Sequence, residues 1–317
     1  MTANRTNRID QSDAVRRLDS DTPGAGIFFA RQLEHIQAEL LEEKRPPLNA
    51  FRLLRTDRSV PAHVKTYTRR MLSANGQAKF IRDYSRDLPR VGVDATEESW
   101  NVRDCGNSYG YSVKEILAAR ATGMPLDSSM AAAAMRAVEE LQNETAWYGN
   151  AAVGLYGLCN YPTFPRLVID TAFDDTSAAD DIISALHTIA NSAHQRTKGI
   201  ARPTAMMMPL AAYNYIATTP RSSTSDTTIL EFFLRTSPFI NRIEPVHELD
   251  ASGPSGEPMI ACFDPSMPGV VDHVLPQLFT QMPPQSVGLE VQVPCWASSG
   301  GIASNYPLEV TLAVLPA

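Results

Sequence analysis

The chain has 317 residues, of which 44% are hydrophobic and 20% are charged. A chain of this length and apolar content can bury one large core or two smaller ones, so the composition excludes a fully disordered protein. The net charge of -7 indicates neither a nucleic-acid binder nor a strongly acidic protein.

The chain opens with a polar segment followed by a short amphipathic helix. Residues 1–20 lack the apolar stretch of a signal peptide, and no apolar run in the sequence is long enough to span a bilayer. We therefore expect a protein that is neither secreted by a signal peptide nor embedded in a membrane. Helical spacing of apolar residues predicts a helix from Phe28 to Glu43, ahead of Pro46-Pro47. Its apolar face must dock on another surface, through Phe29, Leu33, Ile36 and Leu40.

Residues 51–90 form a strongly basic stretch. Ten basic residues stand there against three acidic ones, which is a local charge of +7 and leaves -14 for the rest of the chain. The stretch is either a solvated basic face or an arm that lies on the acidic surface of a second copy. The basic residues, which we predict to make contacts between subunits, are Arg52, Arg55, Arg58, Lys65, Arg69, Arg70, Lys79, Arg82, Arg86 and Arg90.

The same region has the pattern of a β-ribbon. Thr, Tyr and Val alternate with Arg between Ala50 and Trp100, and Asn75-Gly76 has the composition of a hairpin turn. We predict a long two-stranded ribbon with its tip near Asn75. Because a two-stranded ribbon is only marginally stable alone in water, a long one implies that it lies on another surface.

Three helices follow. Ser112 and Glu115 form a capping box for a helix that stops at Gly123. A second helix runs from an N-cap at Asp127 to Gly149, and a third, from Ser177 to Lys198, is expected to lie beside it. The predicted apolar stripe of the second helix consists of Ala131, Ala134, Met135, Val138, Leu141, Thr145 and Tyr148.

Beyond Gly199 the pattern changes to short apolar runs separated by Pro and Gly. These runs predict strands of mixed sheets, with two short helices at Leu210–Ala217 and Thr228–Thr236 between the first two. The fold class is therefore α+β. The predicted strands lie at Ala205–Met208, Met259–Phe263, Leu289–Val293 and Leu308–Leu315.

Residues that could perform chemistry are scattered. The four cysteines form no CxxC pair and are expected to be buried reduced thiols, and the six histidines have no metal-ligand spacing. No GxSxG, GxxxxGK[ST], HExxH or GxGxxG motif occurs. We expect no catalytic site, no metal and no cofactor. The cysteines are Cys105, Cys159, Cys262 and Cys295.

The order of these features resembles that of the major capsid proteins of tailed bacteriophages (Caudoviricetes), which have the HK97 fold. The likeness rests on the helix at Phe28 to Glu43, the basic ribbon, and Tyr109-Gly110-Tyr111-Ser112 leading into a helix. Further matching motifs are Trp147-Tyr148-Gly149, Gly157-Leu158-Cys159-Asn160-Tyr161-Pro162, Gly300-Gly301-Ile302 and Tyr306-Pro307.

The resemblance implies a domain organisation. Residues 1–49 would be the N-arm and 50–100 the extended loop. Residues 101–175 and 276–317 would form the peripheral domain, with a spine helix at 128–148. Residues 176–275 would form the axial domain.

The resemblance also implies a function without catalysis. Many copies would assemble, as hexamers and pentamers, into the icosahedral head that encloses double-stranded DNA, which they would contact non-specifically. Assembly would take place in the cytoplasm of the bacterial host, and the protein would reside in the virion. Portal and decoration proteins are expected partners. So is a separate scaffolding protein, because the chain lacks the long helical N-terminal extension that some members use as a scaffold.

Some family members cross-link neighbouring subunits through a Lys in the extended loop and an Asn elsewhere. Lys65 and Lys79 lie in the corresponding region, but no partner is evident in the sequence. We expect uncross-linked subunits that migrate as monomers after boiling in detergent.

Two other classes of protein are alternatives. An encapsulin-type compartment shell has the same fold and would co-purify with a cargo enzyme in small uniform particles. A metabolic enzyme of unknown type would be a monomer or small oligomer by light scattering.

Overall fold

The computed structural model describes residues 44–80, 88–122, 129–222 and 226–316. The chain divides into two compact units, residues 1–46 and 47–317, and the fold below is that of the second. It contains helices and sheets together, which confirms the α+β prediction. The predicted helix at Phe28–Glu43, with Phe29, Leu33, Ile36 and Leu40, lies outside the described residues, as do the predicted helix stop at Gly123 and the cap at Asp127.

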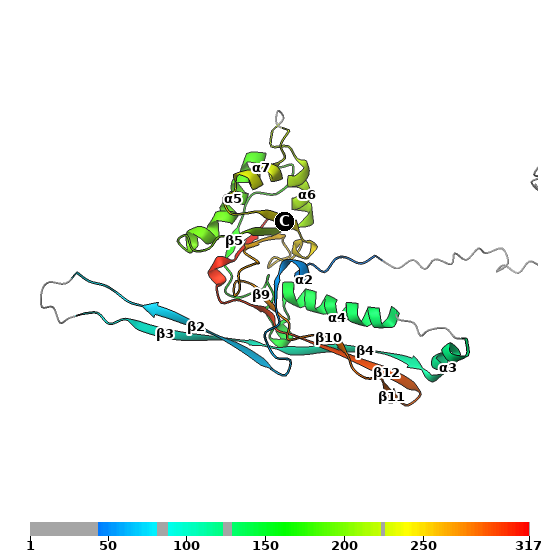
Figure 1. Cartoon of the computed structure of the whole chain (residues 1–317). Coiled ribbons are helices and arrows are strands. Elements are labelled where there is room, and N and C mark those ends of the chain that lie inside the picture. The colour runs from blue at the N-terminus through cyan, green and yellow to red at the C-terminus, as the bar shows by residue number, and fades with distance from the viewer. Residues whose placement is uncertain (1–43, 81–87, 123–128, 223–225, 317) are drawn as a thin grey trace, which may run out of the picture. The chain divides into compact units, whose positions relative to one another are not determined.

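A five-stranded sheet separates the two main cores (Figure 1). Its strand order is β5-β14-β8-β6-β7; β5 and β14 are parallel, as are β6 and β7, and β8 is antiparallel to both of its neighbours. The predicted strands at 205–208 and 259–263 are confirmed. The strands are β5 (Arg166–Val168), β6 (Ala205–Met208), β7 (Arg242–Pro245), β8 (Met259–Phe263) and β14 (Thr311–Val314).

Each face of this sheet covers a separate core, because successive residues of a strand point to opposite faces. Met206 and Met208 belong to the core under α5, α6 and α7, whereas Met207 packs in the other core with Trp147. The third predicted helix is confirmed as α5, but it packs on β14, β8 and α7 instead of beside the second helix. Its broad apolar face suits a sheet. The helices are α5 (Ala179–Arg196), α6 (Leu210–Thr218) and α7 (Ile229–Thr236).

A second sheet lies along the predicted spine helix, α4 (Ser129–Tyr148). β12 is paired over its whole length with β4, and β10 and β11 pair with its other edge. The predicted strand at 289–293 is thus the start of a longer one. The strands are β4 (Arg103–Ser112), β10 (Gln277–Gln281), β11 (Gln285–Val287) and β12 (Glu290–Ser299).

The predicted capping box opens α3 (Val113–Thr122) at the end of β4. The Glu115 carboxylate accepts a hydrogen bond from the Ser112 amide at 2.8 Å, and the Glu115 amide donates to the Ser112 hydroxyl at 3.2 Å. At the other end of α4, Gly149 adopts φ 69°, which stops the helix without the strain a side chain would add. Both local predictions are confirmed.

The buried face of α4 differs from the predicted stripe. Ala134, Val138 and Thr145 are buried as predicted, but Met135, Leu141 and Tyr148 are exposed. Asn143 is buried instead, because α4 contacts polar as well as apolar groups. Spacing of apolar residues alone therefore placed the buried face correctly only in part.

The buried polar groups beside α4 form one network. The Asn143 side chain accepts from the Ala50 amide at 2.9 Å and donates to the Glu248 carboxylate at 2.9 Å. Asn49 donates to the same carboxylate at 2.7 Å, and the Tyr148 hydroxyl donates to the Glu248 carbonyl at 2.6 Å. This network ties three distant segments together: the chain entering α2 (Ala50–Leu53), α4 and η3 (His247–Leu249).

The predicted ribbon is present, but it is shorter than expected. β2 (Thr66–Asn75) and β3 (Gly92–Asn101) pair antiparallel over ten residues each. Asn75 pairs with Gly92, so the tip lies within residues 76–91 and not at Asn75-Gly76. The ribbon does not begin at Ala50, because Ala50, Leu53 and Leu54 are buried in the body core.

A three-stranded sheet joins the ribbon to the body. β9 (Asp272–Val274) lies between β1 (Arg55–Asp57), which is parallel to it, and β13 (Gly301–Ala303), which is antiparallel. Two further short 3-10 helices are η2 (Ala151–Val153) and η4 (Pro307–Glu309).

All four cysteines are free thiols, of which three are buried as predicted and Cys105 is partly exposed. Within the described ranges no group of three potential ligands could hold a metal ion. Every helix described is too short or too polar to cross a bilayer.

Candidate functional site at the base of the hairpin

The β2–β3 hairpin is anchored at its base by a small apolar core. Trp100 packs there with Val60, Val274 and Ala303, and Tyr67 packs against the cluster, with its ring centre 5.8 Å from that of Trp100. The indole Nε1 of Trp100 also donates to the hydroxyl of Tyr161, a body residue, at 3.0 Å.

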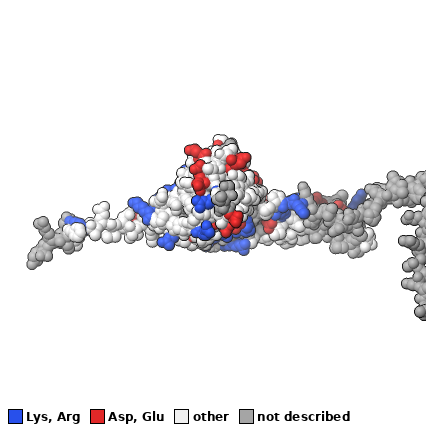
Figure 2. Space-filling model, turned by 90° about the horizontal axis from the view of Figure 1, so that it is seen from above, with Lys and Arg blue, Asp and Glu red and all other residues white. Residues whose placement is uncertain are grey.

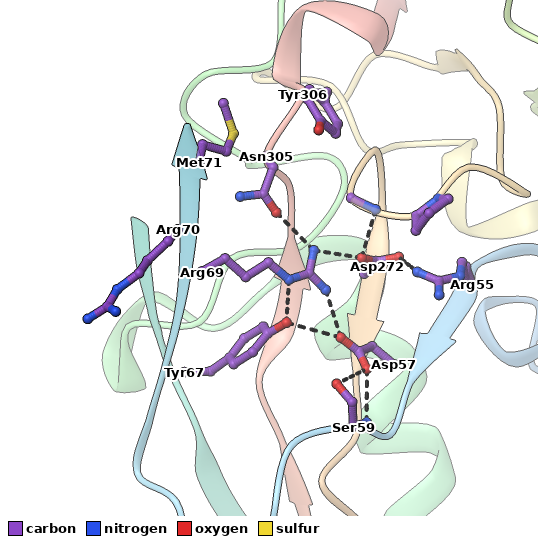
Figure 3. Close-up of a pocket in the computed structure, with 12 residues that line it drawn as sticks. Arg55, Asp57, Ser59, Tyr67, Arg69, Arg70, Met71, Asp272, Asn305 and Tyr306 are labelled. Atoms are coloured by element: carbon purple, nitrogen blue, oxygen red, sulfur yellow. Dashed lines mark hydrogen bonds and ion pairs between the residues drawn. The ribbon is translucent and has the colours of Figure 1, made fainter. Parts of the chain in front are cut away.

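Next to this core, Arg69 of β2 joins the hairpin to the body through ion pairs (Figure 3). Its guanidinium lies 2.7 Å from the carboxylate of Asp57 and 2.7 Å from that of Asp272. The same group donates to the Asn305 side chain at 2.9 Å and to the Tyr67 hydroxyl. We call Arg69, Asp57 and Asp272, together with Tyr67 and Asn305, the latch.

The two latch carboxylates accept several hydrogen bonds each, and the carboxylate of Asp57 is held in the charged state. Burial raises the pKa of Asp57, but hydrogen bonds from Ser59 and the charge of Arg69 outweigh it and lower the pKa to about 2. Asp272 has a fully buried side chain and accepts from Arg55 at 2.7 Å and from the Gly269 amide at 2.9 Å. Burial lowers the pKa of Arg69, yet hydrogen bonds to Tyr67 and Asp272 raise it above its usual value.

The latch residues line a surface pocket of about 430 Å³. Its two carboxylates pair with the guanidinium groups of Arg55 and Arg69, which leaves no unpaired nucleophile or base among the latch residues. The arrangement is suited to holding the hairpin at a fixed angle.

Beyond the latch, the hairpin is exposed on both faces. Every described residue from Leu72 to Gly92 is exposed, and so are the β3 residues up to Ser99. Several are large and apolar, an arrangement that is unfavourable in water. They are Leu72, Phe80, Leu88, Val91 and Val93.

The hairpin is less basic than residues 51–90 suggest. Residues 66–101 contain six basic and five acidic residues, a net charge of +1. Four of the ten basic residues lie before residue 66, and β3 contributes Asp94, Glu97 and Glu98. Arg70 pairs across the strands with Glu97 at 2.7 Å. Acidic side chains cluster over the central part of the molecule in Figure 2, whereas several basic side chains lie near the base of the hairpin.

The structure divides the predicted contact residues into two groups. Arg52, Arg55 and Arg69 form ion pairs with the body of their own chain, to Glu244, Asp272 and the latch. Arg70 pairs within the hairpin. Arg58, Lys65, Lys79 and Arg90 are exposed, and so are Arg52 and Arg70 despite their ion pairs. Arg82 and Arg86 lie outside the described residues.

Sequence reasoning missed the partners of Arg69. Asp57 was counted only as one of three acids, and Asp272 lies 203 positions away from Arg69 in the chain. The available signal was the spacing of Tyr67 and Arg69, which are two positions apart and therefore lie on the same face of β2. It indicated that both side chains face the same surface, but it did not identify that surface.

His273, next to the latch in β9, is a buried histidine without hydrogen-bond partners. Its side chain is fully buried, and neither ring nitrogen has a partner among the described residues. Burial lowers the pKa of His273 to about 4. The neutral ring therefore packs as an apolar group, with its centre 5.8 Å from that of Phe51.

We predict that His273 makes the fold sensitive to acid. The pKa of a histidine in an unfolded chain is near 6.5. The stability that the fold gains by burying His273 in its neutral form is therefore complete above pH 6.5 and is lost as the pH falls toward 4. The loss amounts to about 3 kcal/mol. Urea unfolding of the unassembled subunit at pH 7 and pH 4 measures it. In His273→Leu the loss should be smaller by this amount, and an unchanged pH dependence would contradict the assignment.

Comparison with known proteins bears on the fold and the family. Residues 76–313, about three quarters of the chain, match the family described as Major capsid protein. The chain belongs to the major capsid protein family. A search of curated proteins found no match.

Solved capsid structures share the fold of this major capsid protein. The capsid of Myoviridae phage XM1 has a TM-score of 0.80 at 15% identity, covering 92% of this chain and 100% of that one. The structure from Mycobacterium phage Adephagia has a TM-score of 0.60 at 13% identity, and the match covers 90% of this chain and 95% of that one. The virus-like particle from Pyrococcus furiosus has a TM-score of 0.53 at 15% identity, and the match covers 83% of this chain and 91% of that one. The predicted HK97-type fold is confirmed, and the encapsulin-type alternative is less favoured.

Membership of this family indicates a structural role and a place in the virion.

Proposed function

We propose that this major capsid protein assembles, as hexamers and pentamers, into a closed icosahedral phage head around double-stranded DNA. The hairpin of each subunit lies across a neighbouring copy. One observation carries the proposal: the outer half of the hairpin is exposed on both faces and displays large apolar side chains, although its base is firmly anchored. A ribbon of this kind gains stability when a second surface covers it.

Apolar burial and strand contacts supply most of the assembly energy in this proposal. One exposed ion pair contributes about 0 to 1 kcal/mol, so the surface basic residues cannot hold a shell together alone. Permanent interfaces bury roughly 2,000 to 5,000 Å², and at about 25 cal/mol per Å² the apolar share outweighs the charges. The charges then select register and partner.

The proposal includes other partners and a location. Assembly takes place in the cytoplasm of a bacterial host, with portal, scaffolding and decoration proteins as separate components. Contact with the packaged DNA is non-specific, and no membrane takes part. Phe29, Leu33, Ile36 and Leu40 dock the N-arm on another surface.

The domain boundaries are part of the proposal. The axial domain (176–275) contributes β6, β7 and β8 to the five-stranded sheet, and β5 and β14 of the peripheral segments complete that sheet. The extended loop (50–100) includes α2 and β1, which pack on the body. Only residues 66–101 form the protruding hairpin.

Negative-stain electron microscopy of the purified, concentrated protein tests the proposal directly. Closed particles of uniform curvature are expected, and their subunits should migrate as monomers after boiling in detergent. Particles that contain a co-purified cargo enzyme would favour a compartment shell. A solitary monomer under all assembly conditions would refute the proposal.

Three exposed basic residues, Arg58 and Lys65 before the hairpin and Arg90 at its outer end, offer a second test. The triple variant Arg58→Glu, Lys65→Glu and Arg90→Glu leaves the latch intact and should fold normally. At roughly 0.5 kcal/mol per reversed charge, the concentration needed for assembly should rise about tenfold. Light scattering, recorded over a series of protein concentrations, measures the concentration at which assembly begins. The same residues changed to Gln provide the control, with a smaller shift, and unchanged assembly in both variants would contradict a role for these charges.

A further inference from the structure

A small pocket between α4 and the start of β4 has the features of a binding site for a protein side chain. Its volume is about 120 Å³, and Leu141, Val153, Leu155 and Cys105 contribute to its walls. Leu141 and Val153 are exposed at its rim. The apolar walls and the small volume suit one large apolar side chain.

The pocket also contains an unsatisfied polar group. Gln142 lines it and is 2% exposed, and the side-chain Nε2 has no hydrogen-bond partner among the described residues. A buried donor without an acceptor is destabilising, because it has lost its hydrogen bond to water and has gained none in the protein. A peptide carbonyl brought in by an entering segment would offset this cost, whereas a purely hydrocarbon ligand would not.

The chain carries a side chain that suits the pocket. Phe80, at the outer end of the hairpin, is the most exposed of the large hydrophobic residues described. The described strand residues beside it do not bury it, because they are themselves exposed on both faces. Its backbone carbonyl accompanies the ring.

The charges around the two elements are complementary. The described residues of the hairpin end, 76–80 and 88–91, contain Lys79 and Arg90 and no acid, which is +2. The stretch of α4 beside the pocket, residues 136–145, contains Arg136 with Glu139, Glu140 and Glu144, which is -2. At the pocket itself, the charges of Arg103 and Asp104 cancel. Opposite charges favour this pairing of surfaces over contact between like surfaces.

We propose that the pocket beside α4 receives Phe80 from the hairpin of a second copy of this chain. This docking depends on the proposed shell assembly, and it specifies the site on the neighbouring copy that the outer end of the hairpin occupies. Because donor and acceptor surfaces are different parts of the chain, the contact is heterologous, the type of contact that builds a ring when its rotation closes.

The native Cys105 in the pocket wall allows a direct test. In shells of Phe80→Cys, mild oxidation should link the introduced thiol of one copy to Cys105 of the next and produce a ladder of multimers on a non-reducing gel. The ladder should disappear in Phe80→Cys with Cys105→Ser. Leu72→Cys, another exposed position on the same hairpin, is the matched control and should form no Cys105-dependent ladder.

A second measurement uses the unmodified protein, in case the Cys variant does not assemble. The Cys105 thiol should react with a maleimide at least tenfold more slowly in shells than in free subunits. In addition, Phe80→Ala should raise the concentration needed for assembly by about 10- to 100-fold. Shells without a Cys105-dependent link, or a labelling rate that assembly does not change, would overturn the docking but leave shell formation intact. Failure of the wild type to form shells would refute the proposed function itself.

Discussion

A variant in which an Asn-Gly turn replaces residues 72–95 is expected to fold normally and to form no shells. Met71 and Thr96 are opposite each other in the hairpin, so a two-residue turn can join them without changing the register below. The deletion removes only exposed positions among the described residues and leaves Trp100 and Arg69 in place. The free energy of unfolding of the subunit should therefore change by less than about 1 kcal/mol.

Assembly should be lost because the deleted part carries the apolar surface that a neighbouring copy would cover. Sedimentation velocity and electron microscopy measure assembly, and urea unfolding measures the fold. The double variant Leu72→Lys and Val93→Lys is a matched control that keeps the length of the hairpin but removes two of its five large exposed apolar side chains. We expect it to assemble poorly as well. Normal shells from the shortened variant would show that the hairpin does not hold copies together.

Arg69→Met is expected to destabilise the subunit by about 3 kcal/mol, because it leaves the buried carboxylates of Asp57 and Asp272 with too few positive partners. Arg55 and the Gly269 amide remain on Asp272, which limits the loss. Arg69→Lys should recover only part of it, since one ammonium group cannot reproduce the planar set of donors that spans both carboxylates.

The neighbouring arginine provides the control. Arg70 also lies on β2, but it points to solvent, and its pair with Glu97 is exposed, with side chains 77% and 54% accessible. Arg70→Met should therefore cost no more than about 1 kcal/mol. Urea unfolding of the unassembled subunits compares the two. Equal losses in both variants would show that the latch contributes no more than an ordinary surface ion pair.

The same comparison separates folding from assembly. If the latch fixes the angle of the hairpin, Arg69→Met should also reduce the yield of closed shells under conditions in which the subunit is still folded. Arg70→Met should give normal shells. A folded Arg69→Met subunit that assembles like the wild type would show that hairpin orientation does not depend on the latch.

Local features of the fold could be predicted from the sequence. The capping box of Ser112 and Glu115, the helix end at Gly149 and the buried strand at Ala205–Met208 depend on residues only a few positions apart. Their hydrogen bonds and φ preferences act within one or two turns of the backbone. The presence of a ribbon was predictable for the same reason, from alternation along each strand.

The candidate site was predictable only in part. The resemblance identified the region and the kind of assembly, and the count of basic residues drew attention to Arg55 and Arg69. It did not distinguish residues that pair within the chain from residues such as Arg58 that are exposed. Charge along a sequence does not show which side chains lie opposite each other in space.

The amino-acid sequence alone accounts for where most helices and strands of this capsid protein begin and end, because those signals act between near neighbours. The folded chain decided the rest: the face that α4 buries, the sheet that α5 covers and the carboxylates that hold Arg69. These depend on strand register and on packing between segments as far apart as Arg55 and Asp272, which are separated by 217 positions. Contacts of that range arise from the three-dimensional arrangement of the elements, which no periodicity within a single element specifies.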